Sequence, residues 1–189
     1  ASELLAQQYE ERTGNDCYVI EDCVDGHAEK IDVCFPAPGE PFHLVWFGIP
    51  NNLPGLADAV AQLADLEFPV NLDVVTKASD PATIQFLEYA KRYPVQLNLI
   101  DWTLEAQQTA LKNAHVAIVP SRAKSGKLVK TGNRVATALM AGKPVIAFPI
   151  PSYEVFKDFV ILDTSTASGL QTLASLPLDQ ITEMVESGQ

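Results

Sequence analysis

Short apolar runs along the chain alternate with stretches in which apolar residues recur at helical spacing. The apolar runs predict strands at residues 17–20, 43–47, 70–76, 95–100, 116–120, 144–148 and 160–162. After an opening polar helix, the helical spacing predicts helices at residues 56–66, 81–93, 104–114, 131–141, 166–175 and 178–187. Asp80 is expected to cap the 81–93 helix, and Gly142 to end the 131–141 helix.

This alternation predicts a doubly wound α/β fold with a mainly parallel sheet of about six strands. The run at 116–120 is apolar throughout, as expected where helices cover both faces of a sheet. Residues 1–41 are interpreted as a helix, a short strand and an irregular lead-in, and residues 42–189 as one Rossmann-like domain. The chain does not begin with Met, so we expect a piece of a longer protein.

Ligands bind such sheets at the carboxyl ends of the strands. The loops after Phe47, Ile100, Pro120 and Phe148 are therefore the first places to search for a site. The two ordinary nucleotide motifs, the P-loop and G-x-G-x-x-G, are both missing from the sequence.

The bulk charge and the cysteines narrow the class of protein. A net charge of -11 argues against nucleic acid as a general partner. No apolar run approaches the roughly 20 residues needed to cross a bilayer, and an odd cysteine count favours a reducing, cytoplasmic compartment. Cys17, Cys23, His27 and Cys34 match no C-x-x-C spacing, so thiols without a ligand role are favoured over a zinc site, and we expect no metal and no cofactor.

One segment departs from the acidic character of the chain. Residues 106–153 contain no Asp or Glu, whereas the rest of the chain carries all 24 acidic residues. The same segment holds seven basic residues: Lys112, Arg122, Lys124, Lys127, Lys130, Arg134 and Lys143. This distribution favours an anion-binding site, and the alternative is a basic face that meets an acidic partner domain.

The position of the basic residues favours a phosphate as the anion. The run RAKSGKLVKTGNR follows an apolar strand and leads into a helix, where backbone N–H groups and the helix dipole attract phosphate. Lys130 offers a point charge, and Arg134 offers a planar fork for paired oxygens. Ser121, Lys127 and Asn133 lie in or beside the same run, and they are candidate ligand contacts.

Several other residues after predicted strands are candidates. Trp102 could stack on a nucleobase, or it could be a packed surface aromatic. Tyr153 and Glu154 could meet ribose or sugar hydroxyls, or they could begin a helix on the surface. His115 opens a core strand, and a structural role is favoured for it.

Four segments carry a resemblance to a known family. HLVWFG resembles a first strand and glycine loop, and VIEDCVDG resembles an interdomain tract. WTLEAQQTALKNAHVAIVPS resembles the stretch before a donor site, and KTGNRVATALMAGKPVIAF resembles a helix leading into the turn at Ala141–Ala147. Together they resemble the C-terminal half of group 1 glycosyltransferases of the GT-B fold. Thr137 stands where many of these enzymes have the second of two Glu, and Ile49 and Pro50 replace their usual Arg. Some relatives use the K-x-x-N-R helix start that Lys130, Asn133 and Arg134 match.

The resemblance implies a domain that binds a nucleotide-sugar donor, with Gly48 in the glycine loop. Lys130 and Arg134 would neutralise the diphosphate leaving group without a metal, and Ser121 and Asn133 would orient the ligand. The acceptor would bind an N-terminal domain that this chain lacks, so the chain alone is expected to be inactive. The alternatives are half of a GT-B sugar-nucleotide epimerase, and a non-catalytic domain that binds nucleotide sugars or mediates interactions.

Overall fold

The computed structural model describes residues 2–20, 28–31, 33–37, 39–123 and 128–189. Lys127, Cys23 and His27 lie outside these described residues. In chain order the elements are α1 (Glu3–Thr13), β1 (Phe42–Phe47), the 3-10 helix η1 (Pro50–Asn52), α2 (Leu53–Leu63), β2 (Val70–Thr76), α3 (Pro81–Ala90), β3 (Gln96–Asp101), α4 (Leu104–Asn113), β4 (Val116–Val119), α6 (Asn133–Met140), β5 (Val145–Ala147), the 3-10 helix η2 (Pro151–Phe156), β6 (Ile161–Leu162), α7 (Thr166–Ser175) and α8 (Leu178–Gly188).

The strands form one parallel sheet in the order β3-β2-β1-β4-β5-β6. β1 pairs with β2 along its whole length, from Phe42 opposite Val70 to Phe47 opposite Val75. The chain winds outward from β1 to β3 and then returns to β4 on the other side of β1, so the order reverses between β1 and β4. The predicted doubly wound α/β fold is confirmed.

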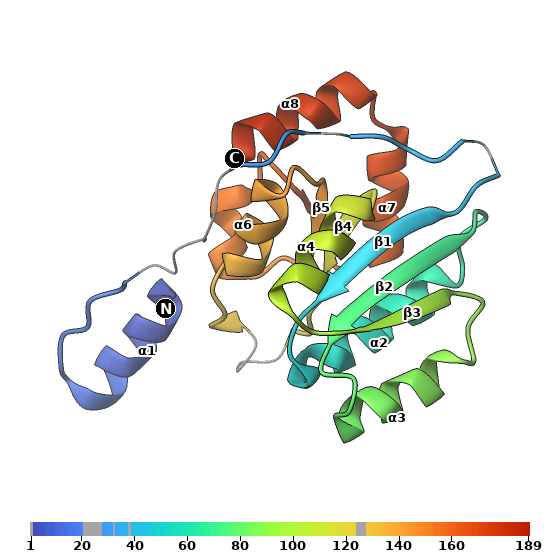
Figure 1. Ribbon diagram of the computed structural model, residues 1–189. Coiled ribbons are helices and arrows are strands. Elements are labelled where there is room, and N and C mark those ends of the chain that lie inside the picture. The colour runs from blue at the N-terminus through green and yellow to red at the C-terminus, as the bar shows by residue number, and fades with distance from the viewer. Residues whose placement is uncertain (1, 21–27, 32, 38, 124–127) are drawn as a thin grey trace.

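Helices cover both faces of the sheet (Figure 1). Successive residues of β1 alternate between the faces: Leu44 and Trp46 pack with residues of α2, α3 and α7, whereas Val45 and Phe47 pack with residues of α4 and α6. All four side chains are buried. Burial on both faces explains why this strand is a continuous apolar run in the sequence.

A glycine brings α2 close to the neighbouring strand. A Cβ atom at Gly55 would lie 3.1 Å from the Cα of Ser121 and 3.2 Å from the carbonyl oxygen of Pro120. Because glycine has no side chain, the first turn of α2 can pack against the carboxyl end of β4. This contact places the segment after β1 beside the segment after β4, at the point where the strand order reverses.

Two helix ends are as the sequence predicted. The Asp80 carboxylate accepts a hydrogen bond of 2.9 Å from the Ala82 N–H at the start of α3. Gly142 follows α6 with a φ of +70°, a left-handed conformation that favours glycine. α2 begins at Leu53, earlier than predicted, and Pro54 in its first turn has the fixed φ that suits this position.

The predicted strand at Cys17–Ile20 is wrong, because these residues form neither strand nor helix. The side chains of Tyr18 and Ile20 are 91% and 81% exposed. An apolar run of this length forms a strand only where a neighbouring strand accepts its hydrogen bonds and a core buries its side chains. Neither is present beside these residues in the described structure.

The irregular segment before β1 lies against the domain. The Glu29 N–H donates to the carbonyl oxygen of Met140 at 2.8 Å, and the Gln189 side-chain amide donates to the carbonyl oxygen of Glu29 at 3.0 Å. This segment therefore contacts the ends of α6 and α8, the two helices beside which it runs in Figure 1.

Candidate functional site

Buried polar side-chain atoms without a hydrogen-bond partner gather at one end of the sheet. Among the described residues they are Trp46 Nε1, Thr76 Oγ1, Ser121 Oγ, Arg134 Nη1 and Nη2, Ser152 Oγ and Tyr153 OH. Trp46 and Thr76 stand at the carboxyl ends of β1 and β2, and the other four residues follow β4 or β5. An unpaired buried polar group costs about 1–3 kcal/mol, and more when it is charged. Such a cluster is therefore expected where a polar ligand binds.

A pocket of about 810 Å³ opens at the same end of the sheet. This volume lies within the range of roughly 300–1,000 Å³ that is usual for small-molecule sites. Its walls are the segment after β1, the residues directly after β2 and β3, the start of α6, and Leu5 of α1. Among the predicted site residues, those that line it are Gly48, Trp102, Lys130, Asn133 and Arg134.

Arg134 is the central positive charge of this pocket. It lies in the first turn of α6, and its two terminal nitrogens are buried without a hydrogen-bond partner. Gly48 faces the guanidinium, because a Cβ atom there would lie 3.4 Å from Nη1. Nη1 and Nη2 of the guanidinium, beside the N-terminus of α6, can therefore donate hydrogen bonds to an anion.

Tyr153 packs next to Arg134 beneath the pocket wall. Burial raises the pKa of the Tyr153 phenol above its usual value, and Arg134 partly offsets this rise by its positive charge and by a side-chain contact with the phenol that is too poorly aligned to be a regular hydrogen bond. The phenol therefore stays neutral beside the guanidinium, and it leaves the positive charge of Arg134 uncompensated.

Lys130 joins two walls of the pocket. Its ammonium donates a hydrogen bond of 2.9 Å to the side-chain oxygen of Asn52 in η1. Both residues line the pocket, although they are 78 positions apart in the sequence. The positive charge of Lys130 therefore lies on the pocket wall, next to any anion that the pocket holds.

Trp102 lines the pocket directly after β3. Its indole N–H donates to the Gln107 side-chain oxygen at 3.0 Å, and the residue is 54% exposed. A half-exposed indole on a pocket wall can present a ring face to a planar ligand. Stacking of a nucleobase on Trp102 stays a prediction.

Among the predicted site residues that the structure describes, three do not line this pocket. Ser121 lines a small neighbouring cleft that also contains Asp58 and Gln62. Tyr153 is fully buried and does not line the pocket, so a contact between its phenol and a ligand hydroxyl stays a prediction. Glu154 is exposed and forms an ion pair of 3.2 Å with Lys157.

The acid-free segment does not act as one basic surface. Arg122 forms two hydrogen bonds, of 2.5 and 2.6 Å, with the carboxylate of Asp58 on α2, which also raise the pKa of the guanidinium. Lys143 is buried and donates to the carbonyl oxygen of Lys112 at 2.9 Å. Of the seven basic residues of this segment, the described ones that line the pocket are Lys130 and Arg134.

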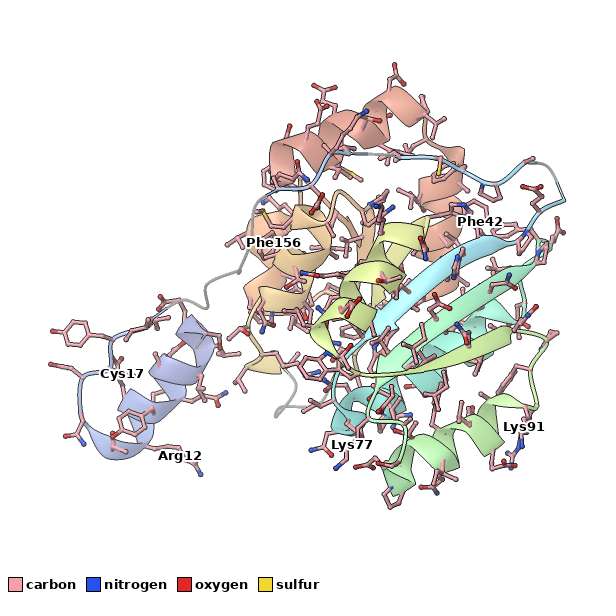
Figure 2. The ribbon with its side chains drawn as sticks, viewed as in Figure 1. Arg12, Cys17, Phe42, Lys77, Lys91 and Phe156 are labelled. Atoms are coloured by element: carbon pink, nitrogen blue, oxygen red, sulfur yellow. The ribbon has the colours of Figure 1, made fainter. Side chains whose placement is uncertain are left out.

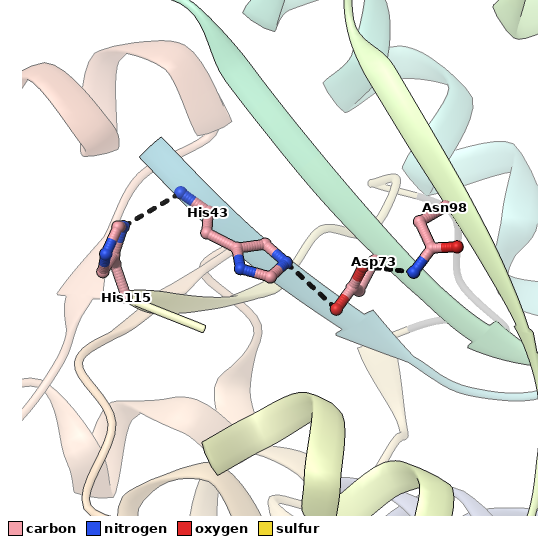
Figure 3. Close-up of polar contacts among 4 residues, drawn as sticks. All are labelled: His43, Asp73, Asn98 and His115. Atoms are coloured by element: carbon pink, nitrogen blue, oxygen red, sulfur yellow. Dashed lines mark hydrogen bonds and ion pairs between the residues drawn. The ribbon is translucent and has the colours of Figure 1, made fainter. Parts of the chain in front are cut away.

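A second polar cluster lies away from the pocket, toward the amino ends of the strands (Figure 3). His43 Nε2 contacts a carboxylate oxygen of Asp73 at 3.0 Å, and the Asn98 amide donates to the other oxygen at 2.9 Å. His115 Nδ1 accepts from the backbone N–H of His43 at 3.0 Å. Because these contacts satisfy the buried carboxylate and tie β4 to β1, we interpret the cluster as structural.

The described residues contain no group of three or more His, Cys, Asp or Glu side chains that could hold a metal ion. Cys17 and Cys34 are free thiols, and the other two members of the zinc set considered above lie outside the described residues. In the part of the chain that the structure describes, each helix is too short or too polar to cross a bilayer.

Sequence reasoning missed Lys77, which directly follows β2 and lines the pocket. The loops searched first were those after β1, β3, β4 and β5, and the same rule applied to β2 would have found it. Asn52 and Gln107 were also missed, because their place in the pocket depends on contacts with Lys130 and Trp102.

No protein-family model and no curated protein matches the sequence. Solved structures of glycosyltransferases do match the fold. AviGT4, a glycosyltransferase involved in avilamycin A biosynthesis, is 22% identical, with a TM-score of 0.61 over 96% of this chain and 55% of that one. WaaB, a lipopolysaccharide outer core galactosyltransferase, is 14% identical, with a TM-score of 0.65 over 98% of this chain and 56% of that one.

A UDP-forming trehalose-phosphate synthase from Burkholderia xenovorans is 11% identical, with a TM-score of 0.57 over 78% of this chain and 40% of that one. The fold is that of one GT-B half. At these identities the likeness concerns the fold alone, and the chain spans about half or less of each of these proteins. The pocket lies at the carboxyl ends of the strands, beside the point where the strand order reverses, which is the usual place for ligands in parallel sheets.

Proposed function

We propose that this chain is the donor-binding, C-terminal half of a glycosyltransferase that uses a nucleotide-diphosphate sugar. The observation that carries the proposal is the guanidinium of Arg134, which is buried without a partner beside a pocket of about 810 Å³. A buried cation is stable only when an anion or acceptors complete it. A diphosphate supplies both the charge and the paired oxygens that a guanidinium fork fits.

In this proposal Arg134 and Lys130 neutralise the nucleoside diphosphate as it leaves the sugar. Negative charge grows on the diphosphate when the bond from the sugar carbon to the phosphate oxygen breaks. Cations and the N-terminus of α6 held in place beforehand stabilise that charge without reorganising, which is electrostatic catalysis. The described pocket lining includes no carboxylate, and we propose that no metal takes part.

The acceptor and its specificity belong, in this proposal, to a second domain of a longer protein. This chain covers 55%, 56% and 40% of the three matched glycosyltransferases, which supports that arrangement. We therefore expect this chain alone to bind donor without transferring sugar. The free thiols of Cys17 and Cys34 support a cytoplasmic setting for the whole protein. The neighbours named above are glycosyltransferases, so we favour transfer over epimerisation.

Titration calorimetry of the chain tests the proposal. We expect UDP or GDP to bind in a buffer that contains EDTA, and uridine or guanosine, which lack the diphosphate, to bind at least about tenfold more weakly, because a charge-assisted hydrogen bond contributes roughly 1.5–3 kcal/mol. If none of the four common nucleoside diphosphates binds, the assignment as a donor-binding domain is wrong. If nucleosides bound as tightly as the diphosphates, Arg134 would not be a diphosphate-binding residue.

A further inference from the structure

The loops after β2 and β3 are tied to each other at the edge of the pocket. The Trp102 N–H donates to the carbonyl oxygen of Thr76 at 2.9 Å, and the Ala78 N–H donates to the Asp101 carboxylate at 2.8 Å. These two bonds hold the backbone on both sides of Lys77 beside Trp102. Figure 2 labels Lys77 at the edge of the sheet where β1, β2 and β3 end. Lys77 is exposed, Trp102 is 54% exposed, and both line the pocket from loops that are bonded to each other.

The orientation of the Gln107 amide follows from its contact with Trp102. An indole N–H can only donate a hydrogen bond, so the amide oxygen of Gln107 must face it, at 3.0 Å. The NH₂ end of the same amide then points away from the indole, and no described residue accepts from it. Gln107 lines the pocket, as do Trp102 and Lys77.

Around Trp102 the pocket thus presents two side chains that donate. The Lys77 ammonium can donate hydrogen bonds but cannot accept them. The side-chain oxygen of Gln107, its only acceptor atom, already accepts from the indole. Uracil, thymine and guanine carry a keto oxygen on the edge where cytosine and adenine carry an amino group. Two donors on the wall therefore suit a keto base, and they would face the donors of an amino base.

We propose that the Trp102 end of the pocket reads the base of the donor, and that it selects keto bases over amino bases. Trp102 supplies the stacking face, which every base can use. Lys77 and Gln107 supply the discrimination by donating to the keto oxygen. This inference rests on the proposed function, because it takes the ligand to be a nucleoside diphosphate whose phosphates meet Arg134.

Titration of the chain with UDP and CDP separates the two classes of base, because these nucleotides share the ribose and the diphosphate. We expect UDP to bind at least about tenfold more tightly than CDP, and GDP to bind more tightly than ADP. A base contact changes the affinity by roughly that factor or more. Lys77→Met removes the ammonium and should reduce the ratio of UDP to CDP affinity to within about threefold. Lys112→Met, on the exposed side of α4, is the matched charge control and should leave the ratio unchanged.

Gln107→Glu provides a second, opposite test. One carboxylate oxygen can still accept from the Trp102 indole, and the other now offers an acceptor to the base, so the preference should shift toward CDP. Added negative charge weakens all diphosphates alike, and the ratio between two of them cancels that effect. Inorganic pyrophosphate, which has no base, should bind the wild-type chain and Lys77→Met equally.

The outcomes distinguish this inference from the proposed function. Equal binding of UDP, CDP, GDP and ADP would overturn base selection and leave the diphosphate site intact. Equal loss of pyrophosphate and UDP affinity in Lys77→Met, at an unchanged ratio of UDP to CDP, would make Lys77 a phosphate contact and refute its role at the base. If no nucleotide and no pyrophosphate bind, the proposed function itself fails.

Discussion

Arg134→Met should stabilise the free protein and at the same time weaken its binding of nucleoside diphosphates. Methionine is unbranched and apolar, so it fills much of the space of the arginine side chain without its unpaired charge. Arg134 Nη1 and Nη2 are buried without a partner in the free protein, whereas a bound diphosphate would accept from both. The same replacement therefore acts with opposite signs on the two states.

The magnitudes follow from the environment of the guanidinium. Relief of an unsatisfied buried polar group should raise the free energy of unfolding by about 1–3 kcal/mol. For a domain of this size that corresponds to a rise of the thermal midpoint by roughly 2–4 °C for each kcal/mol. Loss of charge-assisted bonds to the diphosphate, roughly 1.5–3 kcal/mol, should weaken binding about tenfold to hundredfold.

Two measurements on three proteins test this prediction. Thermal unfolding with and without UDP compares wild type, Arg134→Met and Lys112→Met, because a ligand that binds the native state raises the midpoint. Calorimetry at two salt concentrations then gives the affinities. Lys112 lies on the exposed side of α4, so its replacement removes one positive charge without removing a pocket contact.

Two results would refute the reasoning. A lower midpoint in Arg134→Met together with unchanged UDP affinity would make Arg134 a structural residue that already has its partners. Equal losses of affinity in Arg134→Met and Lys112→Met, both vanishing at high salt, would reveal diffuse attraction to a basic region instead of a specific site.

Three further predictions concern pH, packing and metals. Burial and the nearby charge of His43 hold the pKa of His115 below its usual 6.5. The stability that comes from neutral His115 should therefore be full above pH 6.5 and be lost as the pH falls through the lowered pKa. Urea unfolding at pH 7.5 and pH 5 should show a smaller loss of stability in His115→Gln than in wild type. Gly169→Ala, whose Cβ atom would lie 2.6 Å from Ile146 Cγ2, should lose about 1–3 kcal/mol of stability in urea unfolding at unchanged UDP affinity. UDP affinity in calorimetry should be the same in EDTA and in magnesium, because the described pocket lining holds no carboxylate.

Each of these predictions can fail clearly. A pH dependence that is identical in wild type and His115→Gln would mean that other groups titrate between pH 5 and 7.5. An unchanged unfolding curve for Gly169→Ala would mean that α7 shifts away from the sheet without loss. Binding of UDP that depends on magnesium would contradict catalysis by Lys130 and Arg134 without a metal.

The sequence by itself determined the fold class and most of the elements. Strand and helix patterns depend on the spacing of apolar residues, which is local, and β2 and α7 have the bounds that this spacing predicted. The same reasoning was wrong at Cys17–Ile20, where the described residues offer no neighbouring strand to pair with the run. A strand needs that partner, and the short apolar run does not contain it.

Only the tertiary structure decided which charged residues can serve a ligand. In the sequence Arg122 and Arg134 are equal members of one basic segment. In the fold, Arg122 forms hydrogen bonds with Asp58, 64 positions away on α2, while the terminal nitrogens of Arg134 are buried beside Gly48 without a hydrogen-bond partner. Lys77 joins the pocket from outside the segment, and Tyr153 is withdrawn beneath its wall. The availability of a charge depends on what long-range packing places against it, and the local pattern of residue types does not contain that information.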